Sequence, residues 1–141
     1  MRPRKLITVC VLFLLTVPFL ASCGPAKVDA ALTSYKITLS EDNVPAGDVQ
    51  FHIHNDATDL THEFVIFKTD LAPDSLPLND EGIVDEEGEG ITFIDEQEDI
   101  EPGDALDWTV NLDAGNYVIV CNIDSDQMHY MHGMYVAFTV H

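Results

Sequence analysis

The most restrictive feature of this sequence is a series of short runs in which apolar and polar residues alternate. A period of two places successive side chains on opposite faces of a strand, whereas a helix needs apolar residues at every third or fourth position. Runs rich in aromatic and β-branched residues show this period, namely YKITLS, VQFHIH, HEFVIF, ALDWTVNL, NYVIVCNI and MYVAFTV. Turn-forming sequences such as PAGD (45–48) and DAGN (113–116) separate them. The pattern predicts an all-β fold, an antiparallel sandwich or a barrel.

Alternation also sorts the two faces of individual strands. In the run ALDWTVNL (105–112), the leucines, tryptophan and valine share one side. In VQFHIH (49–54), the apolar positions oppose His52 and His54. An H-x-H pair can bind a metal, but this pattern favours two solvent-facing imidazoles.

The first 22 residues are typical of a secretory signal. Arg2, Arg4 and Lys5 precede the apolar run LITVCVLFLLTVPFL, and small residues follow it. The stretch LASC (20–23) resembles the bacterial lipobox, in which the cysteine is acylated and becomes the new N-terminus after cleavage. Because two or more acyl chains hold a protein stably at a membrane, we predict a lipoprotein anchored through Cys23 at the periplasmic or extracytoplasmic face of the cell envelope.

Domain organisation follows from that cleavage. Removing residues 1–22 leaves about 120 residues, a normal size for one domain with its own core. We expect residues 23–32 to form the lipidated N-terminus and a linker, and residues 33–141 to form the functional domain. The acidic segment 70–101 is expected to be a solvated excursion between strands, with room for a short helix or for the weak strand ITFI (91–94).

The chain is strongly acidic. It has 25 Asp and Glu against 6 Lys and Arg, a formal charge of −19, and removal of the signal takes away bases but no acids. Such a field excludes nucleic acid and anionic lipid as partners, and it favours a basic docking surface on another protein. Solubility or a saline habitat would account for the same charge equally well.

Cys121 is left without a partner for an intramolecular disulfide, because Cys10 leaves with the signal and Cys23 is expected to carry lipid. Exported proteins usually oxidise or avoid a free thiol. Cys121 is therefore expected to be either a buried, small apolar group or a thiolate protected by a bound metal.

The sequence CNIDSDQMHYMHGM (121–134) surrounds this cysteine with histidines and methionines. Thiolate, imidazole and thioether groups suit copper in both oxidation states, and a His₂Cys plane with a weak axial Met is the arrangement of blue-copper electron-transfer sites. A short loop cannot enclose the ion alone. His62, which opens the run HEFVIF at a predicted strand end, is the candidate for the second imidazole.

These motifs resemble the cupredoxins, small blue-copper proteins of the plastocyanin type. The matching residues are Asn55, His62-Glu63-Phe64-Val65-Ile66, Tyr117-Val118, Cys121-Asn122-Ile123, His129-Tyr130 and Gly133-Met134. The resemblance covers about residues 33–141 and implies a Greek-key β-sandwich, here a copper-binding domain. It implies one type 1 copper ion with His62, Cys121 and His129 as equatorial ligands and Met134 as the axial ligand, in a monomer that carries single electrons.

The resemblance implies two further details of such a site. The backbone N–H of Glu63 is expected to donate a hydrogen bond to the sulfur of Cys121. The edge of the His129 ring is expected to be exposed among apolar residues, with Met131 and Tyr130 forming part of the patch that a redox partner contacts.

The loop between the cysteine and the histidine is longer than in the shortest members of the family, so the ligand set stays open. His132 could replace His129, and Met128 or Met131 could replace Met134. Alternation favours Met134, since it shares parity with the apolar residues of the last strand, Val136, Phe138 and Val140. His129 is favoured over His132 because it keeps the family interval before Met134.

Three other functions compete with electron transfer. A copper chaperone or storage protein could pass on Cu(I) through the Met- and His-rich loop. An enzyme such as a multicopper oxidase would need further imidazoles, and those outside the proposed site are expected on polar faces or near the terminus, namely His52, His54, His132 and His141. A zinc hydrolase would prefer carboxylate to methionine. We therefore predict a non-enzymatic electron carrier whose partner is a redox protein.

Overall fold

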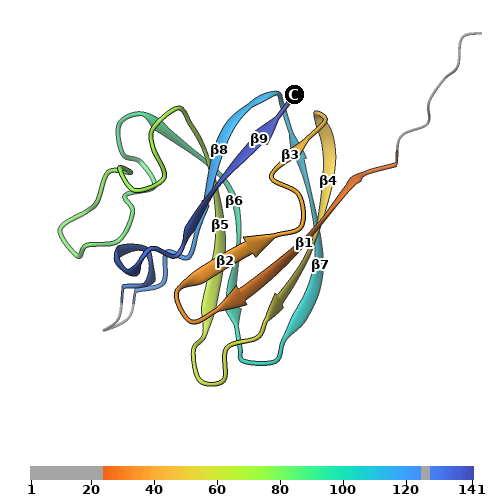
Figure 1. The fold of residues 1–141 in the computed structure, drawn as a ribbon. Helices are drawn as coiled ribbons and strands as arrows, with labels where there is room; N and C mark the ends of the chain where they lie inside the picture. The colour runs from red at the N-terminus through yellow and green to blue at the C-terminus, as the bar shows by residue number, and fades with distance from the viewer. Residues whose placement is uncertain (1–23, 125–127) are drawn as a thin grey trace, which may run out of the picture.

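The computed structural model describes residues 24–124 and 128–141, which form two β-sheets packed face to face (Figure 1). The first sheet has the order β2-β1-β4-β7 and contains β1 (Ala26–Thr33), β2 (Lys36–Leu39), β4 (Gly47–Asn55) and β7 (Ala105–Leu112). The second has the order β3-β9-β8-β5-β6 and contains β3 (Asn43–Val44), β5 (His62–Thr69), β6 (Ile91–Ile100), β8 (Gly115–Val120) and β9 (Tyr135–Val140). The prediction of an all-β sandwich is confirmed.

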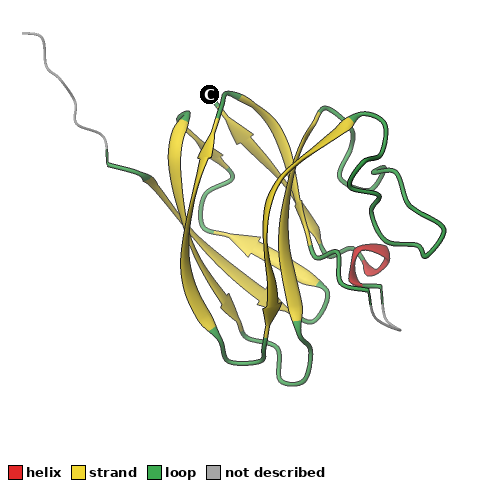
Figure 2. Cartoon of the chain, turned by 180° about the vertical axis from the view of Figure 1, so that it is seen from behind, coloured by secondary structure: helices red, strands yellow, loops and turns green. Residues whose placement is uncertain are grey.

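Most neighbouring strands are antiparallel, but β1 pairs with β4 and β3 pairs with β9 in parallel. The sheets are therefore mixed rather than purely antiparallel as the sequence pattern suggested. A 3₁₀ helix, η1 (His129–His132), precedes β9 and is drawn in red in Figure 2. No helix in the described ranges is both long and apolar enough to cross a membrane. The predicted signal peptide and the lipidation site Cys23 lie outside the described residues.

Alternation builds the core between the two sheets. Val49, Phe51 and Ile53 of β4 are fully buried, while His52 and His54 point to the polar face, as predicted. Phe51 lies within ring-contact distance of Phe64 from the facing sheet, with the ring centroids 5.3 Å apart. Burial of side chains of this size contributes about 1.5–3 kcal/mol each, so the sandwich is a rigid support for its loops.

The prediction of a linker is wrong for most of that segment, because residues 26–33 form β1. This strand pairs with both β2 and β4, and its inward residues Val28, Ala30 and Leu32 are at most 1% exposed. The alternation in AKVDAALT is weak because alanine occupies both faces, and for that reason the sequence did not distinguish it from a linker. Residues 26–33 therefore belong to the folded domain.

The acidic segment also contains more structure than expected. The weak strand ITFI is the start of a ten-residue strand, β6, which extends to Ile100. Because β6 is the last strand in the order of its sheet, most of its side chains are partly or fully exposed and can be acidic.

The remaining loop, residues 70–90, packs against the outer face of the second sheet and is not a solvated excursion. A second apolar cluster joins this loop to the sheet, formed by Val65, Phe67, Leu76, Val84, Val118, Val120 and Tyr130. The long loop runs beside η1, as Figure 2 shows. It therefore supports the C-terminal loop in which the candidate metal ligands lie.

Candidate metal centre

The strand topology brings three donor residues to one end of the second sheet. His62 is the first residue of β5, and Cys121 directly follows β8, the antiparallel neighbour of β5. The start of one antiparallel strand lies beside the end of its neighbour. His129 opens η1 in the connection from β8 to β9, and this connection returns to the same end of the sheet.

The donor atoms of these residues converge on one point. His62 Nδ1 lies 3.1 Å from His129 Nδ1 and 3.7 Å from Cys121 Sγ, while His129 Nδ1 lies 3.3 Å from Cys121 Sγ. A point equidistant from the three atoms lies about 2 Å from each, close to the length of bonds from a transition metal to nitrogen or sulfur, about 2.0–2.3 Å. The donors therefore fit one trigonally bound metal ion.

Burial distinguishes this cluster from a surface group of histidines. His62 and Cys121 are 0% exposed and His129 is 2% exposed. His62 Nε2 has no hydrogen-bond partner among the described residues. A buried polar atom without a partner costs about 1–3 kcal/mol. Burial of the His62 ring therefore lowers the stability of the fold, as expected of a side chain kept for function.

Burial also sets the protonation of the donors. It lowers the pKa of His62 to about 4, with a further contribution from His129, and it lowers the pKa of His129 as well. Both imidazoles are therefore neutral near pH 7, with a lone pair free to bind a metal. Burial raises the pKa of the Cys121 thiol to about 12. A metal ion that binds the sulfur displaces this proton, because a coordinating thiol is deprotonated outright.

Backbone hydrogen bonds hold Cys121 in place. The N–H of Glu63 donates to Cys121 Sγ at 3.2 Å, which confirms the contact that the family resemblance implied. The N–H of Cys121 donates to the carbonyl oxygen of Met134. The N–H of Met134 donates in turn to the carbonyl oxygen of His129. One short network of backbone hydrogen bonds therefore links Cys121, Met134 and His129.

Two asparagines position the segments on either side of the cluster. The amide nitrogen of Asn55 donates to the carbonyl oxygens of Leu60 and Ile100, and its oxygen accepts from the N–H of Ala57, which shapes the turn leading to His62. The oxygen of Asn122 accepts from the N–H of Val84 at 2.7 Å. These side chains connect the turns that carry the candidate ligands to the long loop and to β6.

The structure separates the alternatives that the sequence left open. His129 joins the cluster, whereas His132 is exposed. Met134 is fully buried in the same core cluster as Cys121. Met131 is 59% exposed and Met128 is 37% exposed. The burial of Met134 agrees with the alternation argument, and its role as axial ligand stays a prediction.

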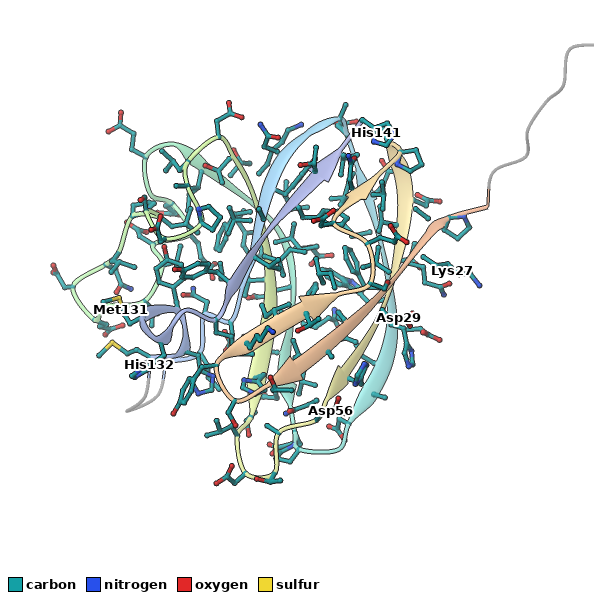
Figure 3. All side chains as sticks on the ribbon, in the orientation of Figure 1. Lys27, Asp29, Asp56, Met131, His132 and His141 are labelled. Atoms are coloured by element: carbon teal, nitrogen blue, oxygen red, sulfur yellow. The ribbon has the colours of Figure 1, made fainter. Side chains whose placement is uncertain are left out.

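One expectation drawn from the resemblance is wrong. The edge of His129 is not exposed, because Tyr35 lies against it with the ring centroids 5.2 Å apart and the planes nearly perpendicular. Tyr130 is also buried, and its hydroxyl donates to the carbonyl oxygen of Pro73. Met131 and His132 do reach the surface, as Figure 3 shows. Tyr35 is not one of the Cys, His and Met donors of a blue-copper motif, so ligand motifs could not identify it.

Glu63, beside the site, has an unusual carboxyl group. Burial raises its pKa from 4.5 to about 7, and repulsion from other carboxylates, chiefly that of Glu96, adds to this. Because the folded pKa exceeds the unfolded one, the stability that this group contributes is full below about pH 4.5 and is lost as the pH rises through 7.

Glu63→Gln should therefore stabilise the metal-free protein at pH 8 by about 1–2 kcal/mol, after allowance for partial exposure, and should have little effect at pH 4. Urea unfolding at the two pH values measures this difference. Glu41→Gln, on the exposed connection between β2 and β3, is the matched control. An equal effect of Glu63→Gln at both pH values would contradict the assigned pKa.

Comparison with solved structures identifies the fold. Reduced auracyanin from the photosynthetic bacterium Roseiflexus castenholzii superposes with a TM-score of 0.58 at 20% identity, over 84% of this chain and 99% of the other. Reduced rusticyanin superposes with a TM-score of 0.61 at 20% identity, over 84% and 81% of the two chains. The chain has the cupredoxin fold.

A further structure with the cupredoxin fold is auracyanin A, described as a "blue" copper protein from the green thermophilic bacterium Chloroflexus aurantiacus. It superposes with a TM-score of 0.55 at 17% identity, over 84% of this chain and all of the other. Neither a scan of protein-family models nor a comparison with curated proteins found a match. At these identities the similarity establishes the fold, and the function has to be argued from the site.

Proposed function

We propose that this chain is a blue-copper electron-transfer protein that binds one type 1 copper ion. His62, Cys121 and His129 would be the equatorial ligands and Met134 the axial ligand. The observation that carries the proposal is the convergence of two neutral imidazole nitrogens and one sulfur, all buried, around a single point. This set suits copper in both oxidation states. The copper named in the description of auracyanin A supports the same assignment.

The protein's own residues account for rapid one-electron transfer. When bound, copper supplies the chemistry by alternating between its +1 and +2 states, giving an electron to a partner redox protein or accepting one from it. The sheet ends and the network through Met134 hold the donors in one arrangement, so little rearrangement accompanies the redox change. The N–H of Glu63 stabilises charge on the sulfur, and burial excludes water; both tune the potential.

Redox cycling of the copper-loaded full chain tests this function. One equivalent of a one-electron reductant should bleach the visible colour, one equivalent of ferricyanide should restore it, and the copper content should stay constant over repeated cycles. Release of copper on reduction would contradict an electron carrier.

Met134→Leu should leave copper bound but raise the reduction potential. The thioether donates electron density that favours Cu(II), and leucine keeps the buried volume without the donor. Cyclic voltammetry of the two proteins measures the shift, with Met131→Leu at the exposed position as control. An unchanged potential in Met134→Leu would exclude Met134 as the axial ligand.

A copper chaperone or storage protein is the second candidate. The exposure of Met131 and Met128 supports it, because soft thioether ligands at the surface can receive Cu(I). Ligand exchange through these residues would deliver copper to an acceptor protein. Transfer of Cu(I) to a chelator that slows in Met128→Leu/Met131→Leu, together with a colourless Cu(II) form, would favour this function over electron transfer.

The location and the partner are further parts of the proposal. The signal-like residues 1–22 and the lipobox cysteine Cys23 support an exported protein, tethered by lipid at the cell envelope, and we propose that it is a monomer. The carboxylates around Glu63 lie next to the ligand His62 and support a redox partner with a basic docking surface.

Electron transfer to a cationic cobalt complex should then slow with added salt, and transfer to ferricyanide should accelerate. Equal salt effects on both reagents would contradict docking near these carboxylates.

A further inference from the structure

Tyr35 has a strained backbone at the tip of the first hairpin. Thr33 of β1 pairs with Lys36 of β2, which leaves Ser34 and Tyr35 as a two-residue turn. The φ angle of Tyr35 is 60°. Glycine and asparagine usually occupy such positions, and a bulky residue with positive φ is an outlier. Strain of this kind persists where the surroundings over-determine the residue, and such residues cluster at functional sites.

The ring of Tyr35 lies against the candidate metal centre. Its centroid is 5.2 Å from that of His129, with the planes at 89°, and 4.8 Å from that of His132, with the planes at 43°. His129 is 2% exposed, whereas His132 is exposed. Tyr35 thus lies between the buried imidazole and the surface. Figure 1 shows the β1–β2 hairpin reaching the C-terminal loop that carries η1.

The contact between Tyr35 and His129 joins residues from different sheets. His62, Cys121 and His129 all belong to the second sheet or to its β8–β9 connection, whereas Tyr35 comes from the first sheet. His129 lies in a short 3₁₀ helix, outside the ladders that fix strand residues. Its ring is packed between that of His62, 4.9 Å away, and that of Tyr35. The first sheet therefore supplies one wall of the site.

We propose that Tyr35 is a positioning residue that closes the metal centre to water and holds the His129 ring with Nδ1 directed at the other donors. This proposal rests on the proposed function for its metal, but the shielding of His129 is a property of the protein without metal. The strained turn is retained because it delivers an aromatic ring to this place. Water and chelators then reach the bound metal slowly.

Tyr35→Gly and Tyr35→Asn test the proposal, since both residues accept a positive φ and remove the ring. Tyr35→Phe is the matched control that keeps the ring. Circular dichroism and thermal melting establish that each variant is folded. In the metal-free proteins, modification by diethyl pyrocarbonate is located by fragment mass spectrometry. His129 should react slowly in wild type and Tyr35→Phe, and at a rate approaching that of exposed His132 in the two ring-free variants.

The second measurement uses copper-loaded protein and an excess of chelator. Loss of copper should be about tenfold faster or more in Tyr35→Gly and Tyr35→Asn than in Tyr35→Phe, as is typical when a supporting partner of a ligand is removed. Unchanged His129 reactivity and unchanged copper release in both ring-free variants would overturn the proposal. A wild-type protein that binds no copper would instead refute the proposed function, while the reactivity of His129 would still decide whether Tyr35 shields it.

Discussion

Cys121→Ser should abolish the visible colour of the copper-loaded protein and leave the β-sandwich folded. The colour expected of a blue-copper site comes from charge transfer between a thiolate and Cu(II), and a serine hydroxyl cannot supply it. The substitution nearly preserves volume in a site that is 0% exposed, where overpacking or a cavity would otherwise unfold the protein. The N–H of Glu63 can still donate to the new hydroxyl.

The absorption spectrum after addition of one equivalent of Cu(II) measures the effect, and far-ultraviolet circular dichroism reports the fold. Met128→Ser serves as a control in the same loop, since Met128 is partly exposed and outside the donor cluster. A Cys121→Ser protein with the wild-type spectrum would refute the thiolate assignment.

His62→Ala should weaken copper binding by more than about 100-fold, beyond the 10- to 100-fold loss typical of outer-shell substitutions. Removing this imidazole leaves two of the three converging donors, Cys121 and His129. Both are supplied by the β8–β9 connection. The variant also removes the Nε2 atom, which has no hydrogen-bond partner in the described part of the chain, so the metal-free protein loses less stability than an ordinary buried truncation would cause.

Competition with a chelator of known copper affinity measures this loss. His132→Ala is the matched control, because His132 is exposed and does not join the cluster. If His62→Ala kept wild-type affinity, the copper site would have to lie wholly within the C-terminal loop, and the proposed geometry would be wrong.

The sequence predicted the donors because their chemistry and strand positions are local features. His62 opens an alternating run and Cys121 closes another, so an antiparallel pairing of the two runs places them together. The choice of His129 over His132 was harder, since both lie in one loop. In the structure the 3₁₀ helix turns His129 inward, toward the other donors, and leaves His132 exposed.

The parts that could not be predicted depend on contacts between distant segments. β1 has weak alternation and is a strand because β2 and β4 pair with it on either side. Loop 70–90 is rich in acids, yet Leu76 and Val84 bury against the second sheet. Tyr35 lies far from every ligand in the sequence, and only the packing of the two sheets brings its ring onto His129.

The central claim is that His62, Cys121 and His129 bind one copper ion as a type 1 site. The most direct test is a titration of the mature protein with Cu(II), followed by optical and electron paramagnetic resonance spectroscopy. The account predicts an intense visible band that saturates at one copper per chain, with the small copper hyperfine splitting of a thiolate-bound ion. A nearly colourless complex with the large splitting of nitrogen and oxygen ligands would contradict it.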